Sequence, residues 1–152
     1  ISGLAVDPTK TFGSNIAYYV NNRGVGNVKV DLGLLDIPVA LYIKALGYEN
    51  DDGILDFGAD TVSKDVSILL ESNTADGGGA YYGFYKGNLS MDAIDLNTIK
   101  DKADELATTD VSFAAGASTN EQTKNKYGTM YFGSDEAKIK KLKAKLGMVA
   151  AG

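Results

Sequence analysis

The stretch that decides the fold is residues 35–57, LDIPVALYIKALGYENDDGILDF. Its first half carries a helix start signal, because Asp36 can accept the free N–H groups of a first turn and Pro38 fits a position where a missing N–H costs little. The helix is expected to end at Gly47, since glycine readily adopts the left-handed conformation that follows a last helical turn. The sequence therefore predicts a helix over 36–46.

The apolar residues of this helix recur at helical spacing. Val39, Ile43 and Leu46 fall at positions i, i+4 and i+7 and would share one face. After the helix, residues 51–53 (DDG) form a turn signal, and residues 54–57 (ILDF) read as a short strand. We expect an amphipathic helix that covers an apolar sheet face, followed by a turn and a strand.

Composition indicates one globular domain over residues 1–152. With 152 residues, 44% of them hydrophobic and 23% charged, the chain can bury a core without a disulfide or a metal. Its eighteen glycines suit a turn-rich β protein. No apolar run approaches the ~18 residues of a membrane-spanning helix.

The chain contains no cysteine and no histidine. This excludes the usual thiolate and imidazole metal sites and nearly all nucleophile–histidine catalysis. The net charge of −5 disfavours a nucleic-acid-binding surface as a property of the whole protein.

Outside the opening stretch, the pattern is mostly that of β-strands. Strands are expected at residues 15–20, 25–32, 65–72, 80–91, 110–117 and 127–133. The first two flank a turn (NNRG) and are expected to pair as a hairpin, and the next two are expected to form the strongest hairpin of the chain. Gly83 and Gly87 indicate a bulge or a close backbone approach.

The remaining segments are two loops, a second helix and an ambiguous region. Residues 73–79 (NTADGGG) and 118–126 (STNEQTKNK) are expected to be flexible loops. A C-terminal helix is predicted over 135–146 within the segment 134–147, with Ser134 as N-cap and Gly147 after its end. Its apolar face would carry Ile139, Leu142 and Leu146, and its other face is rich in lysine. Residues 98–107 show a helical period that favours a helix.

Two groups of carboxylates could carry chemistry. Asp51, Asp52 and Asp56 could bind a hard cation such as Ca²⁺. The twelve-residue calcium-binding loop of an EF-hand is absent, however, and a plain turn is the better interpretation. A second group could supply the acid and base of glycoside hydrolysis. It comprises Asp92, Asp95, Asp101, Asp104 and Glu105. A solvated face explains this second group better, and no catalytic, cofactor or metal residue is assigned.

Glycine, aromatic and lysine clusters are also open to a functional reading. The run Gly77–Gly79 lacks the lysine and hydroxyl residue of a phosphate loop and suits a hairpin tip. The aromatic cluster (Tyr81, Tyr82, Phe84 and Tyr85) could stack on bases or sugars, but cross-strand pairing explains it better. The lysines of the last helix could meet nucleic acid or an acidic partner, although surface helices normally carry charged outer faces.

The order of these elements resembles that of a known family. Residues 35–57 give an apolar helix ending in Leu-Gly, an acidic turn and a strand. A strand at 66–71, the loop at 73–79 and an aromatic strand at 82–87 (YGFYKG) follow. A Lys-x-Lys link at 100–102 then precedes a β segment at 104–117. Over residues 1–117 this order is similar to that of the major tail proteins of long-tailed, non-contractile bacteriophages.

The resemblance implies a mainly β (α+β) fold, an antiparallel β-sandwich flanked by a helix. It implies homohexameric rings stacked into the tail tube as a conduit for genome delivery, with the tape measure and terminator proteins as tail partners. DNA would pass through the lumen without specific binding, and the protein would reside in the virion tail after assembly in the host cytoplasm. It also implies that 98–109 is extended and that family strands ahead of Ile1 are missing.

Two other functions stay open at this point. One is a non-catalytic cell-surface or carbohydrate-binding β-sandwich module that uses Tyr81, Tyr82 and Tyr85. The other is a hydrolase built on a carboxylate pair. The resemblance favours a non-enzymatic structural subunit without cofactor, metal or membrane.

Overall fold

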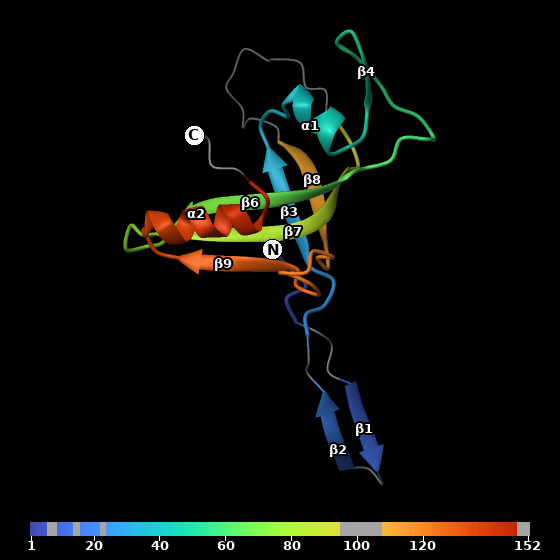
Figure 1. Ribbon diagram of the computed structural model, residues 1–152. Coiled ribbons are helices and arrows are strands. Elements are labelled where there is room, and N and C mark those ends of the chain that lie inside the picture. The colour runs from blue at the N-terminus through green and yellow to red at the C-terminus, as the bar shows by residue number, and fades with distance from the viewer. Residues whose placement is uncertain (6–8, 14–15, 22–23, 95–107, 149–152) are drawn as a thin grey trace, which may run out of the picture.

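The computed structural model describes residues 1–5, 9–13, 16–21, 24–94 and 108–148, which form a mainly β protein with two short helices (Figure 1). In chain order the elements are β1 (Thr9–Gly13), β2 (Ile16–Asn21), β3 (Lys29–Leu34), α1 (Val39–Lys44), β4 (Glu49–Asp51), β5 (Ile54–Asp56), β6 (Asp65–Asn73), β7 (Gly79–Met91), β8 (Thr109–Gly116), β9 (Gly128–Phe132) and α2 (Glu136–Lys145). The predicted mainly β, α+β fold class is confirmed. A sandwich of two packed sheets stays a prediction, since the described strands form one five-stranded sheet and two two-stranded hairpins.

The main sheet is antiparallel and is organised around the long strand β7. Its order is β3-β8-β7-β6, and β9 also pairs with β7. Strand β6 follows one edge of β7, while β8 and β9 share the other edge end to end, with Lys86 opposite Gly116 and Phe84 opposite Gly128. The predicted β6–β7 hairpin is confirmed. Its turn is closed by Thr74, whose N–H donates to the carbonyl oxygen of Gly78 at 2.7 Å.

Gly83 and Gly87 of β7 mark a bulge and two close approaches, as their pattern predicted. The register on β6 moves from Val66–Gly87 to Ile68–Phe84, so β7 carries one extra residue at the point where β8 gives way to β9. A Cβ on Gly87 would lie 2.3 Å from the ring of Phe113, which explains why no side chain fits there.

The main core lies on one face of this sheet and is covered by the segment that includes α1. Val30, Leu89 and Phe113 come from β3, β7 and β8 and are buried together with Leu46, which follows α1. The rings of Phe84 and Phe113 lie 5.9 Å apart. We call this side of the sheet the core face.

Helix α1 is shorter than predicted and turns a different face to the core. It spans 39–44, its N-cap is Pro38 without a side-chain cap bond, and Asp36 therefore does not cap it. Val39 is 56% exposed and Ile43 is half-buried, whereas Leu41 and Leu46 pack on the core. The left-handed conformation expected of Gly47 is present, with a φ of +79°, but the regular helix ends earlier than predicted, at Lys44.

Helix α2 covers the opposite, outer face of the sheet, next to β6, β7 and β9 (Figure 1). Leu142 and Leu146 are buried there, and Ile139 is half-buried, as their spacing predicted. Leu146 lies over Gly83, whose Cβ would approach its methyl group to 2.7 Å. Asp135 caps the helix, so the expected Ser134 cap is wrong by one residue.

The first strands pair differently from the prediction. Strand β2 pairs with β1, where the sequence pattern predicts no strand, and β3 pairs with β8. The link between β1 and β2 has two residues, and a two-residue connection is the commonest way to join antiparallel strands. The β1–β2 hairpin extends away from the main sheet (Figure 1). Most of the ambiguous region 98–109 lies outside the described residues.

Candidate assembly surfaces

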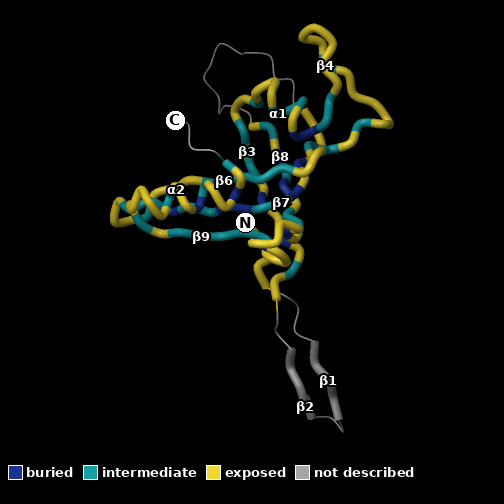
Figure 2. The backbone as a smooth tube through the Cα atoms, in the orientation of Figure 1, coloured by how far each residue is buried: buried dark blue, intermediate teal, exposed yellow. Residues whose placement is uncertain are grey.

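The most exposed described segment is the hairpin built from β4 and β5, with the chain that follows it. We call residues 49–62 the acidic arm. Its tip is a tight turn in which Asp52 and Gly53 have φ values of +48° and +91°, as the two-residue hairpin turn requires. The Asn50 side chain accepts a hydrogen bond from the N–H of Gly53 at 2.9 Å. Nearly the whole arm is exposed and projects from the sheet (Figure 2).

Large apolar side chains lie on this arm without cover. Ile54, Phe57 and Val62 are 66%, 74% and 73% exposed. The base of the arm is held by aromatic contacts, since the ring of Tyr48 lies 5.4 Å from that of Tyr42 and 5.3 Å from that of Phe57. Exposed apolar side chains gathered on one segment are typical of a surface that contacts another molecule.

A second apolar surface lies beside the core face, near the start of the described chain. A hollow of about 400 Å³ is lined mainly by apolar side chains, among them those of Ile1, Leu4, Tyr82 and Met130. Met130 is largely exposed, as is Phe132 two residues further along β9. This hollow gives the sheet another apolar contact surface.

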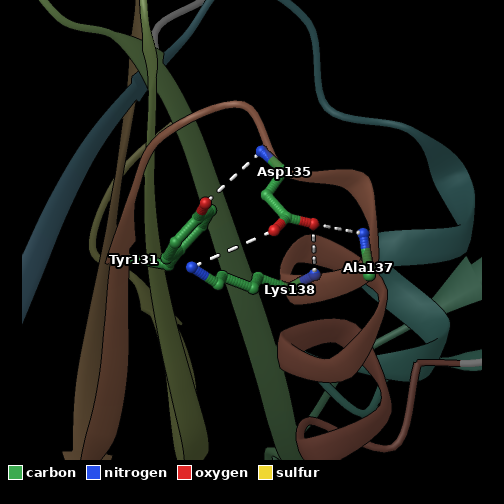
Figure 3. Close-up of polar contacts among 4 residues, drawn as sticks. All are labelled: Tyr131, Asp135, Ala137 and Lys138. Carbon is green, nitrogen blue, oxygen red and sulfur yellow. Dashed lines mark hydrogen bonds and ion pairs between the residues drawn. The ribbon is translucent and has the colours of Figure 1, made fainter.

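Helix α2 is fixed on the outer face by polar contacts around its N-terminus (Figure 3). The Asp135 carboxylate accepts hydrogen bonds from the N–H groups of Ala137 and Lys138 at 2.9 and 3.3 Å. The N–H of Asp135 donates to the Tyr131 hydroxyl of β9 at 3.3 Å, and the Lys138 ammonium lies 5.9 Å from the Tyr131 ring centre. These contacts join the helix start to β9.

A groove runs between α2 and β9, with a volume of about 160 Å³. Lys138, Lys141 and Lys145 line it at positions i, i+3 and i+7 of the helix, together with Met130 and Leu142. Residues at this spacing lie on one helix face. We call this surface the lysine groove. Three lysines of the lysine-rich face predicted for the last helix therefore line a groove.

The inserted loop between β8 and β9 is closed by its own hydrogen bonds. Ser118 and Asn125 are linked through the backbone at 3.0 Å, and the hydroxyls of Ser118 and Thr123 lie 2.7 Å apart and are buried. The flexibility predicted for 118–126, as for 73–79, stays a prediction.

One carboxyl pKa is clearly displaced. Lys86 donates a hydrogen bond to Asp65 at 2.9 Å across the β6–β7 pair, and this bond together with the lysine charge lowers the pKa of Asp65. Both side chains are partly exposed, so this ion pair is a surface contact of β6 and β7 and does not form a reactive pair.

The carboxylate groups considered for chemistry do not gather into a metal site among the described residues. Asp51, Asp52 and Asp56 lie exposed on the acidic arm, and the DDG sequence forms its turn. Asp92 is exposed, while Asp95, Asp101, Asp104 and Glu105 lie outside the described residues. No helix among the described residues has the length and apolar character needed to cross a membrane.

The aromatic cluster on β7 is used in cross-strand contacts, as its more ordinary interpretation predicted. Tyr81 stacks on Tyr131 at 6.1 Å, and Tyr82 meets the ring of Phe132 edge-on at 5.7 Å. The glycine run at 77–79 lies at the end of the β6–β7 hairpin. Two of the three tyrosines considered for sugar binding, Tyr81 and Tyr82, are therefore engaged in cross-strand ring contacts.

Uncovered apolar side chains on a projecting hairpin are typical of a protein that contacts other chains. A comparison of the sequence with models of known protein families identifies the family. Residues 1–145 match the family model described as phage tail tube protein. The match covers most of the 152 residues, and the chain therefore belongs to the phage tail tube protein family and is a structural component of a phage tail. No curated protein and no solved structure matched the chain.

Proposed function

We propose that the protein assembles into homohexameric rings, which stack into the tail tube and enclose the conduit for genome delivery. The family match over residues 1–145 carries this proposal. The tape measure and tail terminator proteins are the further tail partners that we infer, with assembly in the cytoplasm of the bacterial host before the tail joins the virion. The role is structural and needs no catalysis, cofactor or metal.

The two ends of the main sheet support a ring. Strands β3 and β6 lie at the two ends of the order β3-β8-β7-β6, and β9, which pairs only with β7 among the described strands, is a further edge strand. Unpaired N–H and C=O groups on such edges can pair with a strand of another chain. Because the two edges belong to different strands, joining them is a head-to-tail contact, the kind that closes into a ring when the rotation fits.

The net charge supports a conduit through which DNA slides. A chain of net charge −5 gives a ring of six copies a strong excess of negative charge. Such an excess repels the DNA backbone, so DNA would pass through without specific binding.

Electron microscopy of the purified full chain tests this proposal. Negatively stained samples over a range of protein concentrations should show rings about one subunit deep and, at higher concentration, stacked tubes. Sedimentation velocity should show a species of six copies. A chain that stays monomeric at every concentration and ionic strength would contradict the proposal.

A further inference from the structure

We propose that the acidic arm of one copy docks in the lysine groove of a second copy of this chain. This inference rests on the proposed self-assembly and names two of the surfaces that meet. The arm comprises residues 49–62, and the groove lies between α2 and β9.

The charges of the two surfaces are opposite. Five carboxylates and no lysine or arginine lie in the arm, at Glu49, Asp51, Asp52, Asp56 and Asp60. Helix α2 carries five lysines and one glutamate. Opposite potentials of this kind steer two chains together and fix their register.

The groove lysines are not neutralised within the described part of the chain. Lys143 pairs with Glu71 at 2.9 Å and points to β6, whereas Lys141 and Lys145 have no ion pair among the described residues. Lys138 has one contact with Asp135, at 3.9 Å. The groove therefore keeps positive charge for an acidic ligand.

An occupant that offers apolar side chains as well as carboxylates fits the lining of this groove best. Met130 and Leu142 contribute apolar surface to the groove, and on the arm Asp56 stands between the exposed side chains of Ile54 and Phe57. Duplex DNA offers phosphates but no apolar side chains. The arm therefore complements both the positive charge and the apolar lining of the groove, whereas DNA complements only the charge.

A copy cannot fill its own groove. The arm extends from the upper right of the view in Figure 1, whereas α2 lies at the left, across β6, β7 and β9. Docking therefore joins two different surfaces of two copies, a head-to-tail contact that can continue around a ring or along a stack.

Charge exchange tests the docking. The groove variant Lys141→Glu/Lys145→Glu and the arm variant Asp52→Lys/Asp56→Lys should each raise the concentration needed for half-assembly about tenfold or more, because like charges would then face each other. The variant that combines all four changes should return toward the wild-type concentration. The control Lys124→Glu/Lys140→Glu changes the net charge as much as the groove variant but leaves the groove lining intact, and should have a small effect.

Cross-linking gives a readout that does not depend on ring formation. Because the chain has no cysteine, Asp56→Cys and Lys141→Cys proteins can be mixed and treated with a short bis-maleimide. We expect a covalent dimer of the two, and far less product when Lys140→Cys replaces Lys141→Cys. The cross-link without rings or tubes would support the docking and contradict the proposed function, whereas tubes without the cross-link would do the reverse.

Two results would overturn the docking. One is assembly of the groove variant at the wild-type concentration, with no gain from combining the arm and groove changes. The other is a gel shift of duplex DNA by the wild type that the groove variant loses while its assembly is unchanged, since this would assign the groove to nucleic acid.

Discussion

The two faces of the main sheet are covered in different ways. On the core face, Val111 and Phe113 are completely buried, and the segment around α1 closes over them. On the outer face, α2 buries Leu142 and Leu146, while the rest of the helix carries lysines at the surface. The core face holds the fold together, and the outer face supports a helix whose other side is available for contacts. Substitutions on the core face should therefore cost more stability than matched substitutions on the outer face or at the surface.

The largest difference is expected at α1. Leu46 is 6% exposed and packs in the core, so Leu46→Asp would bury an unpaired carboxylate. We expect this change to cost more than about 4 kcal/mol and to prevent stable folding. Ile43→Asp introduces the same charge at a half-buried position outside the core cluster and should cost about 1 kcal/mol.

Urea unfolding followed by circular dichroism measures the free energy of unfolding of the Leu46→Asp and Ile43→Asp variants. Equal losses of stability at the two positions would contradict the placement of Leu46 in the core and of Ile43 outside it.

The two helices also show where helical periodicity predicts a buried face. In α2 the helix is long enough that Ile139, Leu142 and Leu146 follow the period, and the predicted face is the buried one. In α1 the regular helix ends at Lys44, before the period reaches Leu46. The burial of Leu46 depends on the chain path after the helix, where the N–H of Lys64 donates to the carbonyl oxygen of Ala45 at 2.9 Å. That contact joins distant segments and leaves no periodic trace in the sequence.

A second difference is expected between Gly83 and Gly87 of β7. On the core face, a Cβ at Gly87 would lie 2.3 Å from the Phe113 ring and 2.4 Å from the carbonyl oxygen of Ala114. On the outer face, the nearest atoms to a Cβ at Gly83 are the methyl groups of Leu146, at 2.7 and 3.0 Å. The backbone carbonyl and the buried ring near Gly87 cannot move away from an added methyl group. The methyl groups of Leu146 near Gly83 can, because the leucine side chain can change its rotamer. Gly87→Ala should therefore cost about 3 kcal/mol and Gly83→Ala about 1 kcal/mol.

Chemical unfolding of the two alanine variants of β7 checks this order. A Gly83→Ala variant that is as unstable as Gly87→Ala would show that α2 is packed as rigidly as the core.

Much of the sheet could be predicted from the sequence, but the assembly surfaces could not. The residue pattern located β6, β7, β8 and β9, and in β8 the buried residues Val111 and Phe113 alternate with more exposed ones. The apolar residues Ile54 and Phe57 were also read as part of a strand, and β5 does form. Their exposure depends on how far the hairpin stands from the sheet, which local pattern does not encode. The signal that could have suggested it is the density of carboxylates on both sides of these residues.

The pairing of the first strands was missed for a related reason. The strand at 9–13 contains too few apolar residues for a clear alternation, so β2 was assigned to the next strand along the chain. Short connections decide such pairings when burial does not. Sequence patterns therefore predict the strands of the main sheet well, and they predict the pairing and exposure of the outlying segments poorly.

The smallest difference is expected at the start of α2, on the outer face. Asp135→Ala removes the side chain that accepts hydrogen bonds from Ala137 and Lys138 and should cost about 1 kcal/mol. In a chain of this size that loss corresponds to a fall in melting temperature of about 2–4 °C. Ser134→Ala, at the cap position that the sequence alone suggested, removes no bond found in the structure and should stay within about 0.5 kcal/mol of the wild type. Thermal unfolding of the two variants in parallel decides between the caps, because a larger effect at Ser134 would place the helix start one residue earlier.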